Sequence, residues 1–193
     1  MIQSIIYERE MSLNNTMNEI SDKWGNEQTV TGPVLNIPYK NFYYDANGKI
    51  NEIKGHIHVL PDKLNIYGKL LPEKRYRGIY EVVVYNAQLD FSGTFPVLNA
   101  SELNINNSDI FWKDAFISVG IPDMRGIKDN IYFNWNGKKA ALNPGIDSKD
   151  ISASGVSVPV VIMPNDSSVG NYEFSFALNL NGSKNLNFIP LGK

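Results

Sequence analysis

The apolar residues of this chain change their spacing at Gly25, and this change limits the folds that the chain can adopt. Between residues 2 and 24 they recur at the intervals of an α-helix, and neither Gly nor Pro occurs in this stretch. After Gly25 they alternate with a period of two, in short runs separated by Gly, Pro, Asn and Asp. The sequence therefore predicts one N-terminal helix followed by a chain made of β-strands.

The expected helix is amphipathic and would be about 35 Å long at 1.5 Å per residue. Gly25 occupies the usual position just past a helix end. Its apolar positions are Ile2, Ile6, Leu13, Met17, Ile20 and Trp24. Two interpretations follow from the pattern: the helix packs on a sheet, or it continues upstream into a segment that precedes residue 1.

Short β-branched and aromatic runs mark the expected strands, at residues 56–60, 63–70, 77–89, 115–120, 130–135, 156–163, 172–180 and 186–189. Asn-Gly pairs at residues 47–48, 136–137 and 181–182 indicate hairpin turns. A parallel sheet would need a long, usually helical, crossover after each strand, and beyond Trp24 only a helical turn near residues 100–103 is indicated. We therefore expect a mainly β fold with one N-terminal α-helix, an antiparallel β-sandwich or open barrel built from hairpins and meanders.

Composition excludes several classes of function. The chain has 18 basic and 20 acidic residues, which gives no electrostatic footprint for nucleic acid. It has no Cys, so disulfides, thiolate metal sites and cysteine catalysis are excluded. With 193 residues it can form a substantial core, and we expect a helical segment at 1–25 and a β domain at 26–193. The longest apolar run after the helix, residues 158–163, is too short to span a bilayer.

His56 and His58 are the only histidines and the only candidates for a metal site. Residues i and i+2 of a strand share one face, so both imidazoles could reach one ion. A zinc or copper site needs a third ligand and usually a fourth, and only Glu52 and Asp62 lie near in the sequence. Two ordinary, half-buried or exposed histidines are the simpler interpretation, and no cofactor is expected.

Two charged segments are candidates for ligand binding. Asp123, Arg125 and Gly126 follow an expected strand, and Arg beside Asp could clamp an anion or carboxylate, or could tie the loop to the body. Arg75, Arg77 and Tyr80 alternate basic and aromatic side chains. Such a segment could stack on sugars or bases, or could be a solvated strand face.

No catalytic motif accompanies these segments. The sequence contains no Gly-x-Ser-x-Gly elbow, no Gly-rich phosphate loop and no His-Glu-x-x-His motif. No histidine is placed near a nucleophile, so acyl and phosphoryl transfer have no support. We therefore assign no catalytic residue and expect that the chain is not an enzyme.

Several segments resemble a known family. Residues 60–68, 75–80, 84–85 and 93–95 are similar to the extracytoplasmic region of the CreD family of cell envelope integrity inner membrane proteins. Residues 5–9, 32–33, 37–38, 117–127, 178–182 and 188–192 match further segments of that region in the same order. The resemblance covers nearly the whole chain, and the order of the motifs makes it specific.

The resemblance implies that these residues belong to a larger bacterial inner membrane protein and lie on its periplasmic side. Residues 2–8 would then be the emerging end of a first membrane span, and further spans would follow residue 193. The implied partners are envelope components or the membrane-embedded remainder of the same protein. A strand edge left unpaired could also join two copies of the chain.

Three functional hypotheses follow. The first is a non-catalytic domain that interacts with envelope components, since the family is associated with envelope integrity and with envelope-stress and β-lactam responses. The second is a carbohydrate-active or hydrolytic module, suggested by three Trp, ten Tyr and scattered carboxylates. The third is a sensing or gating domain that helix 2–24 couples to the membrane helices.

Overall fold

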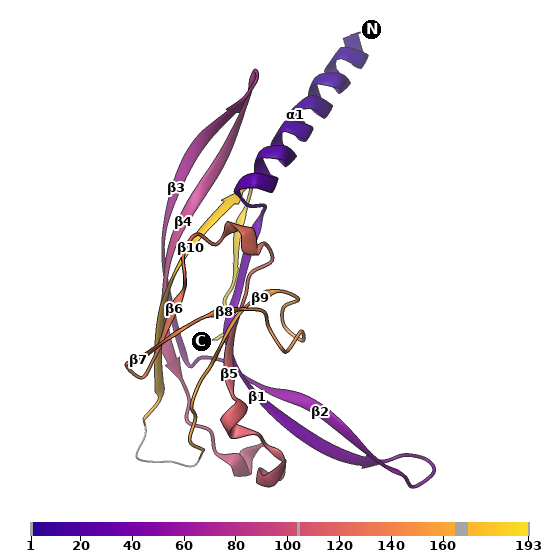
Figure 1. Ribbon diagram of the computed structural model, residues 1–193, viewed down its shortest axis with the longest axis vertical. Helices are drawn as coiled ribbons and strands as arrows, with labels where there is room; N and C mark the ends of the chain where they lie inside the picture. Colours follow the sequence, from indigo (N-terminus) through magenta and orange to yellow (C-terminus); the bar gives the residue numbers. More distant parts are fainter. Residues whose placement is uncertain (1, 104, 165–169, 193) are drawn as a thin grey trace.

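Two β-sheets face each other in this computed structural model, and one long helix projects from one end of the pair (Figure 1). The structure describes residues 2–103, 105–164 and 170–192. Within these ranges α1 (Ile2–Trp24) is the only α-helix. It ends at Gly25, as predicted from the sequence, and the Gly25 amide donates to the carbonyl of Ser21 over 2.8 Å.

In the part of the chain that the structure describes, the two sheets contain eleven strands between them. The first sheet has the order β11-β1-β5-β9-β8, and β2 also pairs with β1. Its strands are β1 (Gln28–Tyr44), β2 (Ile50–Val59), β5 (Phe116–Gly120), β8 (Asn143–Pro144), β9 (Gly155–Pro159) and β11 (Leu186–Ile189). The second sheet has the order β3-β4-β10-β6-β7. Its strands are β3 (Lys63–Arg77), β4 (Tyr80–Phe95), β6 (Tyr132–Trp135), β7 (Lys138–Ala141) and β10 (Tyr172–Ser183).

The pairing of the strands confirms the predicted fold class. Among the described strands all pairs are antiparallel except β1 with β11, which run parallel over four residue pairs. In the described ranges the sheets form a sandwich and do not close into a barrel. The described connections contain four short 3-10 helices: η1 (Ala100–Glu102), η2 (Asn107–Asp109), η3 (Trp112–Asp114) and η4 (Met124–Gly126). The first of them is the helical turn expected near residue 100.

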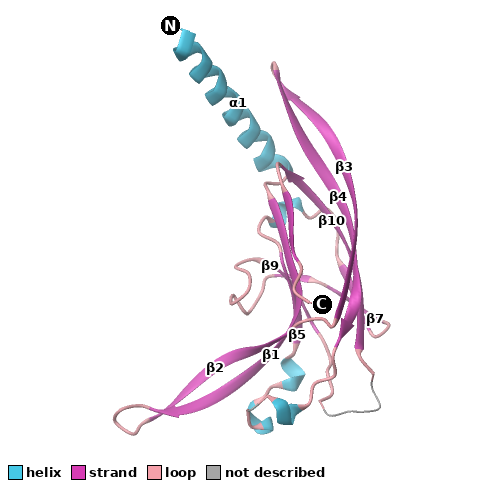
Figure 2. Cartoon of the chain, turned by 180° about the vertical axis from the view of Figure 1, so that it is seen from behind, coloured by secondary structure: helices cyan, strands magenta, loops and turns pink. Residues whose placement is uncertain are grey.

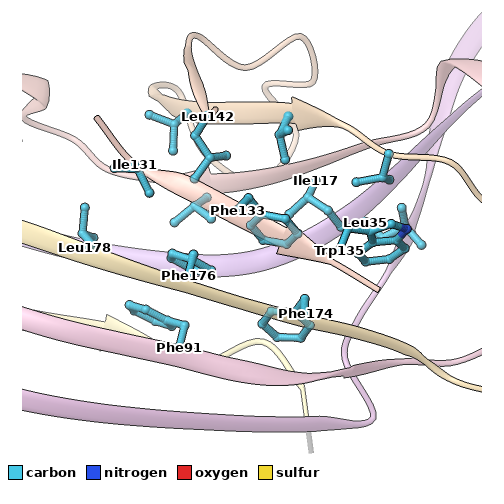
Figure 3. Close-up of a cluster of buried hydrophobic side chains, with 14 of the residues drawn as sticks. Leu35, Phe91, Ile117, Ile131, Phe133, Trp135, Leu142, Phe174, Phe176 and Leu178 are labelled. Carbon is cyan, nitrogen blue, oxygen red and sulfur yellow. The ribbon is translucent and has the colours of Figure 1, made fainter. Parts of the chain in front are cut away.

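Aromatic side chains of the second sheet fill the space between the layers. The rings of Phe91 and Phe176 stack with centroids 4.5 Å apart, and Phe133 stacks on Phe174 at 5.9 Å. Leu35 and Ile117 meet them from the first sheet (Figure 3). Each such burial stabilises the fold by about 1.5–3 kcal/mol. The period of two in the sequence places these residues on the inner faces.

Two of the three Asn-Gly pairs form the expected turns. Residues 47–48 connect β1 to β2, and residues 136–137 connect β6 to β7. The turn predicted at residues 181–182 is wrong, because both residues lie inside β10 and pair with Asn86 and Tyr85. Gly182 is needed there for space, since a Cβ on it would contact the Tyr85 ring.

The strand boundaries predicted at 63–70 and 77–89 are also wrong. β3 continues to Arg77, and the turn to β4 lies at residues 78–79, where Gly78 has φ +59°. Pro72 and the charged residues after it interrupt the apolar pattern, so the sequence suggested an early end. β3 is an edge strand of its sheet, and an edge tolerates a proline that donates no hydrogen bond.

Helix α1 does not pack on a sheet along its whole length. Residues 3–11 are exposed on every side, and the first buried side chain is Thr16. Only the C-terminal part contacts β4 and β10. The exposed part projects alongside the β3–β4 hairpin in both views (Figures 1 and 2). Among the described residues, no helix combines the length and apolar character that a membrane crossing requires.

Candidate functional site

The C-terminal end of α1 is the place where the candidate residues from separate parts of the sequence meet. The β3–β4 hairpin, η4 and the end of β10 all contact it. We call the residues that hold this end, directly or through a neighbour, the helix collar: Gln28, Arg75, Arg77, Tyr85, Asp123, Arg125 and Ser183.

Asp123 and Arg125 form the central pair of the collar. The Asp123 carboxylate accepts hydrogen bonds from Nε and Nη2 of Arg125, each at 2.9 Å. It also accepts from the backbone amide of Asn26 at 2.9 Å. Nη1 of Arg125 donates to the carbonyl of Asp22 over 3.1 Å. That carbonyl is among the last four of α1, which lack partners within the helix, so the pair acts as a cap.

The pair is therefore engaged within the protein. Hydrogen bonds from Arg125 lower the pKa of Asp123 to about 2, with help from the Asn26 amide and against the effect of burial. A carboxylate held in this way stays charged at neutral pH and does not serve as a general acid. The arrangement matches the loop-tying interpretation of the Asp123, Arg125 and Gly126 segment.

Trp24 joins the last turn of α1 to the second sheet. Its indole Nε1 donates to the carbonyl of Tyr85 over 3.0 Å. The guanidinium of Arg75 lies over its ring, with Cζ 4.3 Å from the centroid, and Lys128 Nζ lies 5.4 Å from it. Each such cation contributes about 0.5–1 kcal/mol at a partly exposed site.

Arg77 makes an ion pair with Glu19 one turn further from the sheet. Arg75 and Arg77 thus both hold α1. Tyr80 lies opposite Arg77 in the β3–β4 pairing, beside the hairpin turn, and is the candidate residue that lies apart from the collar.

Close backbone approach brings η4 and α1 onto β10. A Cβ on Gly25 would lie 2.5 Å from the carbonyl oxygen of Asn181, and a Cβ on Gly126 would contact the same oxygen. Gln28 Nε2 donates to this oxygen at 3.2 Å and to the carbonyl of Asp123 at 3.1 Å. Gly126 is therefore at a packing position, where only glycine lets the two backbones meet.

The two histidines lie elsewhere, on β2. His58 Nδ1 is 2.8 Å from Asn36 Oδ1, and His58 Nε2 is 3.1 Å from Asp150 Oδ2. The His56 ring packs edge-on against Phe116 with centroids 5.8 Å apart. Over residues 2–103, 105–164 and 170–192, no three His, Asp or Glu side chains are grouped to hold a metal ion.

A cavity of about 850 Å³ borders η4, the element that also carries Arg125 of the helix collar. Its walls come from η4 and the residues after it, from the β7–β8 connection and from the segment before β9. The lining residues are Met124, Ile127, Lys128, Asp129, Asn130, Ile131, Leu142, Pro144, Gly145, Ile146, Lys149, Ala153, Ser154, Gly155 and Val156. A volume of this size is typical of small-molecule sites.

Comparison with known proteins identifies the family. The family model described as "Inner membrane protein CreD" matches residues 1–193. This chain belongs to the CreD family. A curated member, the inner membrane protein CreD of Escherichia coli strain K12, is 28% identical over 196 residues. The alignment covers 100% of this chain but 42% of that relative, so the chain spans less than half of its length. No solved structure matches the chain.

The CreD-family match is in agreement with the resemblance found in the sequence. Both segments singled out there, residues 75–80 and 123–126, lie within the matched range and contribute to the helix collar.

Sequence reasoning missed Gln28 and Tyr85 as collar residues, and Trp24 as the helix residue that the collar contacts. From the sequence alone, Trp24 is only one of the apolar positions of the expected helix. Its place in the last turn, directly before Gly25, is the sequence signal for a residue that anchors the helix end. The cavity had no such signal, since its lining is scattered over connections.

Proposed function

We propose that this chain is the periplasmic domain of a CreD-like bacterial inner membrane protein and contributes to cell envelope integrity without catalysis. In this proposal the β-sandwich interacts with envelope components, and α1 couples it to the membrane-embedded remainder of the protein. The family assignment supports the membrane association, and the exposed N-terminal half of α1 supports a connection on that side.

The observation that carries the coupling role is the helix collar. The β3–β4 hairpin and η4, far apart in the sequence, converge on the last turns of α1 through a capping pair, an ion pair and a cation–π contact. A free-standing helix would need few of these contacts. A helix that transmits a force or rotation to the sandwich needs a stiff attachment at this end.

A hydrolytic role has less support. Glycoside hydrolysis requires two carboxyl groups about 5–10 Å apart across a cleft. The cavity beside η4 is lined by one carboxylate, Asp129, and by no aromatic side chain in the described residues. Asp129 is also engaged, because Asn179 Nδ2 donates to it over 3.0 Å.

The coupling role is tested by breaking α1 between its exposed half and the collar. Asn15→Pro places a proline in the helix interior, where it removes one hydrogen bond and clashes with the preceding turn. Asn15 is exposed, so the sandwich keeps its core. Cells that carry the variant in the full-length protein should lose their resistance to β-lactam and detergent stress.

Asn15→Ala is the matched control, because alanine keeps the helix intact. It should preserve the resistance, and both purified domains should retain the thermal unfolding transition of the sandwich. If Asn15→Pro cells survive stress as well as wild-type cells, α1 does not couple the domain to the membrane and the proposal fails.

A further inference from the structure

The cavity beside η4 has an apolar floor and a basic rim. Ile131, Leu142 and Val156 lie at its base and are each exposed by less than a tenth. The half-buried side chains of Met124, Ile127 and Ile146 give the apolar surface that a ligand can reach. The Leu142 amide donates to the Ile131 carbonyl over 2.9 Å, so the backbone at the floor is paired. An apolar chain placed there would lose water contact without leaving these backbone groups unsatisfied.

Charge at the rim favours a negative ligand group. Lys128 and Lys149 line the cavity together with one acid, Asp129, whose carboxylate already accepts a hydrogen bond from Asn179. Within the described ranges Lys149 has no ion pair with an acidic side chain. An anionic group that replaced water at Lys149 would add an ion pair beside an apolar surface, where screening is weaker than in bulk water.

We infer that this cavity binds a single-chain amphiphile with one anionic head group, its chain against Met124, Ile127 and Ile146 and its head beside Lys149. Such a ligand needs an apolar surface for its chain and a positive charge for its head group, and the cavity has both. A sugar would need more polar partners than the floor offers, and a cationic amphiphile would meet like charge at the rim.

The cavity and the helix collar share η4. Met124 and Ile127 face the cavity, whereas Asp123 and Arg125, which alternate with them along the chain, hold α1. Lys128 likewise lines the cavity while its Nζ lies over the Trp24 ring. A bound ligand therefore contacts the segment that caps the helix. This transmission step, but not the binding site, rests on the proposed function.

The site is tested by titration calorimetry of the 193-residue chain with dodecanoate below its micelle concentration. We expect saturable binding of one dodecanoate and no saturable binding of dodecyltrimethylammonium, which has the same chain and the opposite charge. Lys149→Glu should weaken dodecanoate binding by about tenfold, the size expected for reversing one partly screened charge.

Two further variants separate the site from general effects. Ile146→Asp puts a charge on the apolar wall and should abolish binding. Lys113→Glu makes the same charge change in η3, outside the cavity, and should leave binding unchanged. The inference is overturned if dodecanoate does not saturate, if the cationic amphiphile binds equally well, or if Lys149→Glu binds like the wild type.

Hydrogen exchange measures separately whether ligand binding changes the segment that caps α1. The Asn26 amide donates to Asp123, and the amides of Gly126 and Ile127 donate within η4. Dodecanoate should change the exchange rate of these amides by severalfold, while amides of the distant β1–β2 turn stay constant. Binding without such a change would refute transmission and leave the site standing. Binding with a normal phenotype of Asn15→Pro would refute the coupling function alone.

Discussion

Nη1 of Arg125 donates a 3.1 Å hydrogen bond to the carbonyl oxygen of Asp22, which joins η4 to the last turn of α1. The two residues are 103 positions apart, and the same guanidinium is held by Asp123. This loop is therefore one of the contacts that set the direction of the helix relative to the sandwich, together with the β3–β4 hairpin and β10. These contacts make the collar a point where a small change in the β domain would move the exposed half of α1.

Removal of this guanidinium should loosen the helix more than the sandwich. For Arg125→Ala we expect only a small loss in the free energy of unfolding, since the side chain is more than half exposed and solvent screens its ion pair. Hydrogen exchange at the Asn26 amide should accelerate much more than exchange in β4 or β10.

Arg125→Lys provides the matched comparison. It keeps the positive charge but cannot form the two-pronged contact with Asp123 and also reach the Asp22 carbonyl. Its exchange at Asn26 should resemble that of Arg125→Ala. If the Asn26 amide of Arg125→Lys exchanges at the wild-type rate, the positive charge alone holds the helix end. That result would contradict a role for the two-pronged contact with Asp123.

Acid should weaken the collar through Asp123. Its folded-state pKa is lowered to about 2 from an ordinary value near 3.8, so its stabilising contribution is present above pH 4 and is lost as pH falls through about 2. The side chain is only 11% exposed. The contribution is at most about 2 kcal/mol, because one pKa unit corresponds to 1.36 kcal/mol.

Urea unfolding of Asp123→Asn and wild type between pH 2 and pH 6 measures this contribution. The stability difference between them should shrink as pH falls below 4. A difference that is constant over the whole range would show that the Asp123 charge has no part in the effect.

A methyl group at Gly126 should separate η4 from β10. The added Cβ would contact the Asn181 carbonyl oxygen and lie 2.7 Å from Gln28 Nε2. Overpacking of this kind costs about 1–3 kcal/mol. Gly126→Ala should therefore lower the melting temperature and accelerate exchange of the Ile127 amide.

Gly170→Ala is the control, because a Cβ at Gly170 has no neighbour within 4 Å and its φ is not in the left-handed range. Its melting temperature should equal or slightly exceed that of the wild type. Equal melting temperatures for both variants would show that η4 can move away from β10 at no cost.

The sequence allowed the helix, its end at Gly25 and the sandwich to be predicted, because these depend on local spacing. The failure at Gly182 has a physical cause. An Asn-Gly pair favours a turn locally, but here the long pairing of β10 with β4 and the space required by the Tyr85 ring determine its conformation.

The collar shows a different limit of sequence reasoning. Arg75, Arg77, Asp123 and Arg125 could be selected for their chemistry, yet nothing in their spacing indicated that they meet at one helix end. The sheet topology, and not the local sequence, brings together residues that are about 100 positions apart. The cavity was missed for the same reason, since its walls come from separate connections.

The proposed function also predicts which end of the molecule faces a bilayer. The β3–β4 hairpin projects beside the exposed half of α1, and Ile79 at its turn is 86% exposed (Figure 2). Tyr76 and Tyr80 flank it, and tyrosine beside an apolar tip is typical of the membrane interface. The chain has no cysteine, so Ile79→Cys gives a single site for an environment-sensitive fluorophore. With the N-terminus tethered to vesicles, we expect a blue shift of this label and quenching by spin-labelled lipids.

The matched label is Asn47→Cys, in the β1–β2 turn at the far end of the molecule (Figure 1). That turn is also exposed and adjoins the apolar residues Tyr44 and Ile50, so it controls for general adhesion to lipid. If α1 leads to the bilayer, only the label at position 79 reaches the interface, because the ion pair of Arg77 with Glu19 keeps the hairpin beside the helix. A blue shift at position 47 instead, or at both positions equally, would reverse or remove the orientation on which the proposed coupling depends.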